Sequence, residues 1–289
     1  MIPSLDFGGS GPRLHFAHAN GFPPGAYKPL IETLTQHYHV CSMLFRPLWP
    51  ELHSTPQTLK SWADFADDLL RFFDERDERG VIGVGHSLGA IVTLVAALRR
   101  PELFRALVLI DPVLFRRRMQ WAWDFLKRFE WGRNLHPFIP GTMRRRRLFA
   151  TRDEMFAHFR FARPLRHIDD RGLWAYVDSI AKPRPDGQIE LAYSPEWEVK
   201  VYEAGPLDLW SQLKELKSPL IIIRGVYTNA FLPKAAQRVQ NFLPDAIIHT
   251  VEGAGHLVPL EKPDAVGMLI SEFLSEGVMR NNRYVIRDT

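Results

Sequence analysis

The sequence predicts an α/β protein with a mostly parallel central sheet flanked by helices and a helical cap inserted into the chain. Apolar runs of strand length alternate with helical patterns over most of its 289 residues. One of these runs, residues 81–84, leads into a turn with a serine between two glycines and then into an apolar helix. Between residues 115 and 213 the alternation gives way to arginine runs and aromatic residues. The length, with 46% hydrophobic residues, suits one α/β domain plus an insertion.

The expected core comprises residues 1–114 and 214–289. Its predicted strands cover residues 14–17, 39–44, 81–84, 106–110, 219–225 and 246–251. Its predicted helices cover residues 27–36, 59–73, 88–98, 234–242 and 265–274. The polar residues 280–283 are expected to fray at the C-terminus.

The expected cap comprises residues 115–213, which hold the arginine runs 116–118 and 144–147. Its aromatic residues recur at helical spacing, which predicts helices with an aromatic inner face packed on the core. They are Trp121, Phe125 and Phe129, followed by Phe149, Phe156 and Phe159.

The turn after residues 81–84 is typical of a nucleophile elbow around Ser87. To expose a hydroxyl above a sheet, the chain must reverse from strand to helix within one residue, which places that residue in strained backbone geometry. Gly85 and Gly89 lack a Cβ atom, so the strand and helix can approach closely. The apolar helix that follows ends at Pro101. Ser87 is therefore the predicted nucleophile.

A histidine follows the last predicted strand on a glycine-rich loop, Glu252-Gly253-Ala254-Gly255-His256. From such a loop, a histidine can lean over the sheet and act as the general base of a serine nucleophile. A loop histidine bonded only to backbone is the ordinary alternative for any one of the 11 histidines. The upstream serine motif favours the catalytic role for His256.

With these motifs in this order, the chain resembles the α/β-hydrolase superfamily, particularly small bacterial esterase-like members. The resemblance implies a Ser–acid–His triad and a cap inserted after the strand that follows the nucleophile helix. It also implies that an oxyanion hole is formed by the amide of Leu88 and a second amide from the loop His18-Ala19-Asn20-Gly21-Phe22. Because Ala19 replaces the commoner glycine of this loop, the second donor is either Asn20 or Phe22.

The resemblance places the triad acid shortly after the strand at 219–225, but Asn229 stands there. An amide can orient an imidazole, yet it cannot stabilise the imidazolium by charge. Asp111 directly follows the strand at 106–110. One branch of the haloalkane dehalogenases carries its acid at the end of this earlier strand, and ligand sites of open α/β sheets form at such strand ends. Asp111 is the predicted acid; Asn229 and Glu252 are the alternatives.

The predicted reaction is hydrolysis of a carboxylic ester through an acyl-enzyme, with a small substrate carrying an apolar acyl group. C–C bond hydrolases, lactonases and perhydrolases share this triad and stay open as alternatives. A non-catalytic binding protein on the same fold also stays open as an alternative. Serine at position 87 argues against haloalkane dehalogenases and epoxide hydrolases, which use aspartate there. No metal or organic cofactor is implied.

Composition narrows the setting. A single cysteine, Cys41, excludes an internal disulfide and fits a reducing compartment. The N-terminus lacks a secretory pattern and no run reaches transmembrane length, so a cytoplasmic protein without stable membrane insertion is expected. A formal net charge of only +4, without a recognisable binding motif, argues against a nucleic-acid partner. The oligomeric state is left open.

Overall fold

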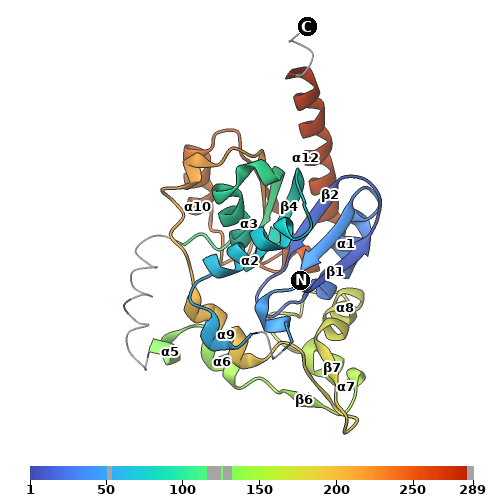
Figure 1. Cartoon of the computed structure of the whole chain (residues 1–289). Coiled ribbons are helices and arrows are strands. Elements are labelled where there is room, and N and C mark those ends of the chain that lie inside the picture. Colours follow the sequence, from blue (N-terminus) through green and yellow to red (C-terminus); the bar gives the residue numbers. More distant parts are fainter. Residues whose placement is uncertain (51–53, 116–124, 126–131, 285–289) are drawn as a thin grey trace.

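A computed structural model describes residues 1–50, 54–115, 125 and 132–284. A seven-stranded sheet forms the centre, in the order β1-β3-β2-β4-β5-β9-β10 (Figure 1). Only β1 runs antiparallel, along β3, and the other neighbours pair in parallel. The strands are β1 (Ser4–Gly8), β2 (Arg13–Ala17), β3 (His39–Met43), β4 (Val81–His86), β5 (Phe104–Ile110), β9 (Leu220–Gly225) and β10 (Ile247–Val251).

Helices cover both faces of this sheet. Successive side chains of a strand point to opposite faces and pack into two separate apolar clusters. Leu107 and Leu109 of β5 point into one cluster, while Val108 and Ile110 point into the other. The first cluster is covered by α2 (Ala63–Asp74), α3 (Leu88–Arg99) and α10 (Pro233–Phe242). The second is covered by α1 (Lys28–Leu34), the short α11 (Val258–Glu261) and α12 (Pro263–Tyr284). The predicted α/β architecture is confirmed.

The segment between β5 and β9 carries a group of elements at one end of the sheet (Figure 1). The sequence predicted a helical segment here, but the structure also contains a small antiparallel sheet formed by β6, β8 and β7. These strands have two or three residues each, too few to show an alternating pattern. The elements are α5 (Gly132–Leu135), α6 (Ile139–Met143), β6 (Leu148–Phe149), α7 (Arg152–Arg160), α8 (Asp170–Ile180), β7 (Ala181–Pro183), β8 (Ile189–Leu191) and α9 (Pro195–Ala204).

Three other expectations need correction. The strand β1 was not predicted, because its sequence is partly polar and lies at the sheet edge. The helix expected over residues 27–36 divides into a 3₁₀ turn, Pro24–Tyr27, and α1. The polar residues 280–283, expected to fray, lie within α12. Cys41 lies half-buried in β3.

The aromatic residues of the inserted segment are partly buried as expected. Phe149 and Phe159 are buried, and Phe156 stacks on Trp174 with ring centroids 4.4 Å apart. Phe125 is 57% exposed and therefore does not belong to an inner face. The remaining members of the pattern, Trp121 and Phe129, lie outside the described residues.

The arginine run at 144–147 is largely matched by carboxylates. Arg145 pairs with Glu198, Arg146 with Glu154 and Arg147 with Glu196.

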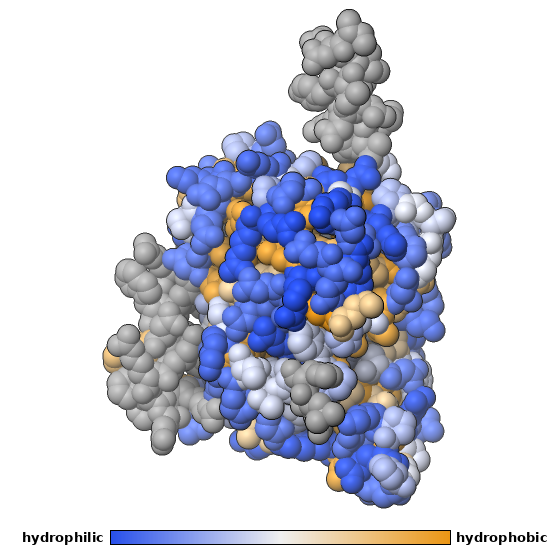
Figure 2. All heavy atoms as spheres, in the orientation of Figure 1, coloured by the Kyte–Doolittle hydropathy of each residue, from blue (hydrophilic) through white to orange (hydrophobic). Residues whose placement is uncertain are grey.

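Hydrophilic side chains dominate the face shown in Figure 2, with apolar patches between them. In the part of the chain that the structure describes, no helix is long and apolar enough to cross a membrane. The other arginine run, at residues 116–118, lies outside the described residues.

Candidate active site

Ser87 occupies the reversal between β4 and α3, in the geometry that the motif predicts. Its backbone has φ 54° and ψ −112°, a strained combination for a residue with a side chain. Its N–H donates to the carbonyl oxygen of Ile110, the last residue of β5, at 2.9 Å. A Cβ on Gly89 would lie 2.0 Å from the carbonyl oxygen of Ala17. Glycine is therefore what allows the first turn of α3 to meet the end of β2.

His256 lies between Ser87 and Asp111 and is hydrogen-bonded to both. Its Nε2 is 2.9 Å from Ser87 Oγ, and its Nδ1 is 2.8 Å from Asp111 Oδ2. Asp111 accepts the Nδ1 proton, so Nε2 is left free to accept the proton of the serine hydroxyl. The three residues come from the ends of β4 and β5 and from the loop after β10. The structure thus brings together the three predicted triad residues.

Asp111 is fully buried at the end of β5. Its backbone is in the left-handed region with φ 44°, and its N–H donates to the carbonyl oxygen of Ile223 at 2.8 Å. Burial raises the pKa of this carboxyl, against the opposing effect of its hydrogen bonds to His256 and Thr228. Its Oδ1 has no hydrogen-bond partner among the described residues. An ionised Asp111 therefore depends on its contacts at Oδ2.

Neither of the two alternatives to Asp111 is hydrogen-bonded to the imidazole in the described structure. Asn229 and Glu252 are both exposed, and the bond to His256 Nδ1 comes from Asp111. The loop after β9 contributes instead through Thr228, whose Oγ1 donates to Asp111 Oδ2 at 2.5 Å. Thr228 is buried and was not predicted. An isolated threonine carries no sequence signal, and only its position beside Asn229 pointed to this loop.

The two residues predicted to supply the second oxyanion donor, Asn20 and Phe22, differ in their hydrogen bonds. The N–H of Phe22 donates to the carbonyl oxygen of Ala19 at 3.3 Å, so it is already used within the loop. The side chain of Asn20 is held by Tyr193, which donates to its Oδ1 at 2.9 Å. Leu88 is the first residue of α3, and its N–H therefore has no partner within the helix. Because the Phe22 N–H is already bonded within the loop, Asn20 is the favoured candidate for the second donor.

A buried ion pair from the inserted segment contacts this loop. Glu198 of α9 is 3% exposed and accepts hydrogen bonds from both terminal nitrogens of Arg145. Burial raises the pKa of Glu198, while Arg145 opposes this rise. A Cβ on Gly21 would lie 3.2 Å from the Glu198 carboxyl carbon, and Asn20 Nδ2 donates to the Glu198 carbonyl oxygen at 3.1 Å. The inserted segment and the loop after β2 are therefore packed tightly together.

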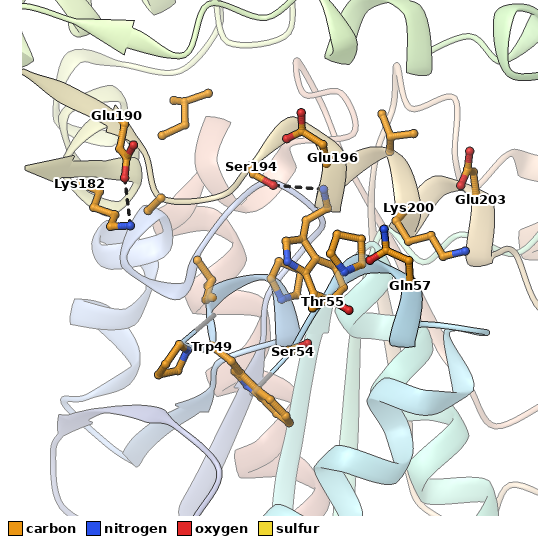
Figure 3. A pocket seen from close by; sticks show the side chains of 18 of the residues that line it. Trp49, Ser54, Thr55, Gln57, Lys182, Glu190, Ser194, Glu196, Lys200 and Glu203 are labelled. Atoms are coloured by element: carbon orange, nitrogen blue, oxygen red, sulfur yellow. Dashed lines mark hydrogen bonds and ion pairs between the residues drawn. The ribbon is translucent and has the colours of Figure 1, made fainter. Parts of the chain in front are cut away.

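An open groove of about 1380 Å³ lies between residues 47–50 and 54–57 of the core and the inserted segment (Figure 3). Trp49 and Trp197 line it, along with Lys182, which pairs with Glu190 at 3.0 Å. None of Ser87, Asp111 and His256 lines the groove, and Ser87 is only 8% exposed. The groove and the triad are thus separate features. Across the described ranges, no group of three or more His, Cys, Asp or Glu residues could hold a metal ion.

A parallel sheet with a serine elbow and a histidine hydrogen-bonded to both that serine and a carboxylate defines the class of α/β hydrolases. Residues 16–267 match the alpha/beta hydrolase family, and the chain belongs to it. The predicted family and fold are confirmed.

Two relatives align over most of the chain. An uncharacterized hydrolase, YugF, from Bacillus subtilis is 23% identical over 261 residues, 86% of this chain and 85% of that protein. The 2-(acetamidomethylene)succinate hydrolase of Mesorhizobium japonicum is 25% identical over 267 residues, 92% of this chain and 89% of that protein. The crystal structure of an E-2-(acetamidomethylene)succinate hydrolase superposes with a TM-score of 0.77 at 23% identity, covering 95% of both chains. That structural likeness concerns the fold.

Proposed function

We propose that this protein is a serine hydrolase that cleaves carboxylic esters through an acyl-enzyme intermediate. The observation that carries the proposal is the continuous hydrogen-bonded series from Ser87 Oγ through His256 to Asp111. A serine hydroxyl is a weak nucleophile until a neighbouring base accepts its proton, and this series supplies the base and the group that orients it.

In the proposed reaction, Ser87 Oγ attacks the ester carbonyl while His256 Nε2 takes its proton. Asp111 fixes the imidazole and stabilises its positive charge. The amides of Leu88 and Asn20 donate to the oxyanion as the tetrahedral intermediate forms. His256 then protonates the leaving alcohol. Water, deprotonated by the same imidazole, attacks the acyl-enzyme and releases the acid with a regenerated Ser87.

An apolar acyl group is the proposed preference. Leu88, next to the nucleophile, belongs to the same apolar cluster as Tyr193 and Trp197 of the inserted segment, which we propose acts as the cap. The 2-(acetamidomethylene)succinate hydrolase relative leaves a second substrate class open, and hydrolysis of a small carboxylate-bearing substrate is the alternative.

The test combines active-site labelling with turnover. A fluorophosphonate should label the purified protein at Ser87, identified by peptide mass spectrometry, and a panel of p-nitrophenyl esters of increasing chain length should be hydrolysed. Ser87→Ala should abolish labelling and turnover while its circular dichroism and melting temperature stay close to those of the wild type. A folded wild-type protein that neither reacts nor turns over any ester would refute the proposal.

A further inference from the structure

Two buried side chains outside the triad join the parts of the chain that carry it. Tyr27, in the 3₁₀ turn Pro24–Tyr27, places its hydroxyl 3.2 Å from the amide nitrogen of Ala19 and 2.8 Å from Nδ1 of His86. His86, the last residue of β4, places its Nε2 2.9 Å from the carbonyl oxygen of His256. Both side chains are fully buried. The series links the loop after β2, the residue before the nucleophile and the backbone of the base.

The ends of this series fix every proton along it. A backbone N–H can only donate and a carbonyl oxygen can only accept, so Ala19 donates to Tyr27 and His86 Nε2–H donates to His256. A neutral imidazole with its proton on Nε2 has an acceptor at Nδ1. The Tyr27 hydroxyl therefore donates to Nδ1, and its lone pair receives the Ala19 N–H. All hydrogen bonds run in compatible directions, with no polar atom of either side chain left unpaired.

A charged imidazole does not fit this arrangement. Protonation at Nδ1 would turn the acceptor for the Tyr27 hydroxyl into a second donor and leave that hydroxyl proton without its partner. Burial lowers the pKa of His86 well below its ordinary value, and the neighbouring His256 acts in the same direction. The neutral state is thus favoured by both geometry and burial.

We propose that Tyr27 and His86 are positioning residues that hold the oxyanion loop and the His256 backbone in register with Ser87, with His86 as the neutral Nε2–H tautomer. The inference rests on the proposed function, because it assigns the residues to that same site. Neither side chain is hydrogen-bonded to Ser87 Oγ or to Asp111 in the described structure. Their effect on turnover is therefore exerted through the loops that they connect.

The first test measures kcat and KM for Tyr27→Phe, which removes only the hydroxyl. Rates are normalised to the fraction of protein titrated by a fluorophosphonate, so that misfolded protein does not count. Displacing a reacting group by about 1 Å can cost on the order of 100-fold in rate. We therefore expect kcat to fall by about 10- to 100-fold, with KM changed by less than about threefold.

Variants at His86 separate a positioning role from packing alone. His86→Leu should lose about as much kcat as Tyr27→Phe, and the double variant should lose no more than either single one, since the two side chains act together. His86→Gln offers a carboxamide donor and acceptor and should recover part of the rate. The matched control is His15→Gln. His15 is also fully buried and accepts a hydrogen bond from the Met43 amide, but its ring packs against Phe72 and Phe73 of α2 and it lies outside the series formed by Tyr27 and His86.

A second readout is independent of activity. In a two-bond ¹⁵N–¹H spectrum of the ¹⁵N-histidine-labelled wild type, the signals lost in His86→Gln should show the Nε2–H tautomer, unchanged down to pH 5. An Nδ1–H tautomer would overturn the inference. So would a fully titrated Tyr27→Phe enzyme with wild-type kcat. If the wild type itself fails to react with the fluorophosphonate, the proposed function falls, whereas the tautomer measurement still decides the hydrogen-bond series.

Discussion

At the scale of single residues, Asp111 carries the sharpest prediction. If it stabilises the imidazolium of His256, Asp111→Asn should lower kcat by about 10³- to 10⁴-fold with little change in KM, because the carboxylate acts on the base. Asparagine tolerates the left-handed backbone of this position, so the variant should fold. Asn229→Ala is the control, since Asn229 is exposed, and it should retain nearly full turnover. Wild-type kcat in folded Asp111→Asn would remove Asp111 from the mechanism.

The Asp111 carboxyl should also change how the stability of the protein depends on pH. Its folded-state pKa is raised by burial, so its contribution to stability is fully present below the unfolded pKa and is lost as the pH rises through the folded value. Near pH 8 the folded protein must hold a buried charge that asparagine would not have. Asp111→Asn should therefore melt about 2 °C or more above the wild type at pH 8, with the difference shrinking toward pH 4. Thermal unfolding at pH 4, 6 and 8 measures this. A variant less stable than the wild type at pH 8 would contradict the reasoning.

The sequence could name Ser87, His256 and Asp111 because each follows a predicted strand in a position that the chemistry requires. Thr228 and Tyr27 could not be named in this way. Thr228 reaches Asp111 across 117 residues of chain, and this contact depends on the pairing of β9 with β5. Neither a threonine nor a tyrosine repeats at a spacing that signals such a contact. Their roles emerge only from tertiary structure.

At the scale of elements, the junction between α3 and β2 depends on Gly89. An alanine Cβ there would meet the backbone of Ala17, which cannot rotate away. Gly89→Ala should lower the melting temperature by about 4 °C or more and reduce the fraction of protein titrated by a fluorophosphonate. Gly141 of α6 is the control because a Cβ there meets nothing within 4 Å. Gly141→Ala should leave both quantities near wild type or raise the melting temperature slightly. Equal behaviour of the two variants would contradict the close-approach explanation.

The elements differ in how well sequence could predict them. The buried strands β4, β5 and β9 are continuous apolar runs, and they lie next to one another at the centre of the sheet. The strand β1 lies at the edge and is partly polar, so it lacks such a run. In the small sheet of the inserted segment, α7 and α8 separate β6 from β7 and β8 along the chain, so the pairing of β6 with β8 is determined by tertiary contacts.

At the scale of the whole molecule, the Arg145–Glu198 pair links the inserted segment to the loop after β2. Arg145→Met should leave Glu198 buried without its counter-charge and lower the free energy of unfolding by about 3 kcal/mol. The double variant with Glu198→Gln removes both charges and should recover part of this loss. Urea unfolding of the two single variants and the double variant measures the coupling. Additive effects would show that the pair does not act as a unit.

The hydrogen bond between Thr228 and Asp111 also bears on how such triads diverge. The resemblance places the acid after either of two strands, and here the segments that follow β5 and β9 are joined by the 2.5 Å hydrogen bond from Thr228 Oγ1 to Asp111 Oδ2, beside one imidazole. A lineage can therefore acquire a second acid in the loop after β9 before it loses the first, while the base keeps its place. A protein with carboxylates at both places would hold two like charges close together, which favours a shared proton. Relocation of the acid in this fold then requires two substitutions and no change in topology.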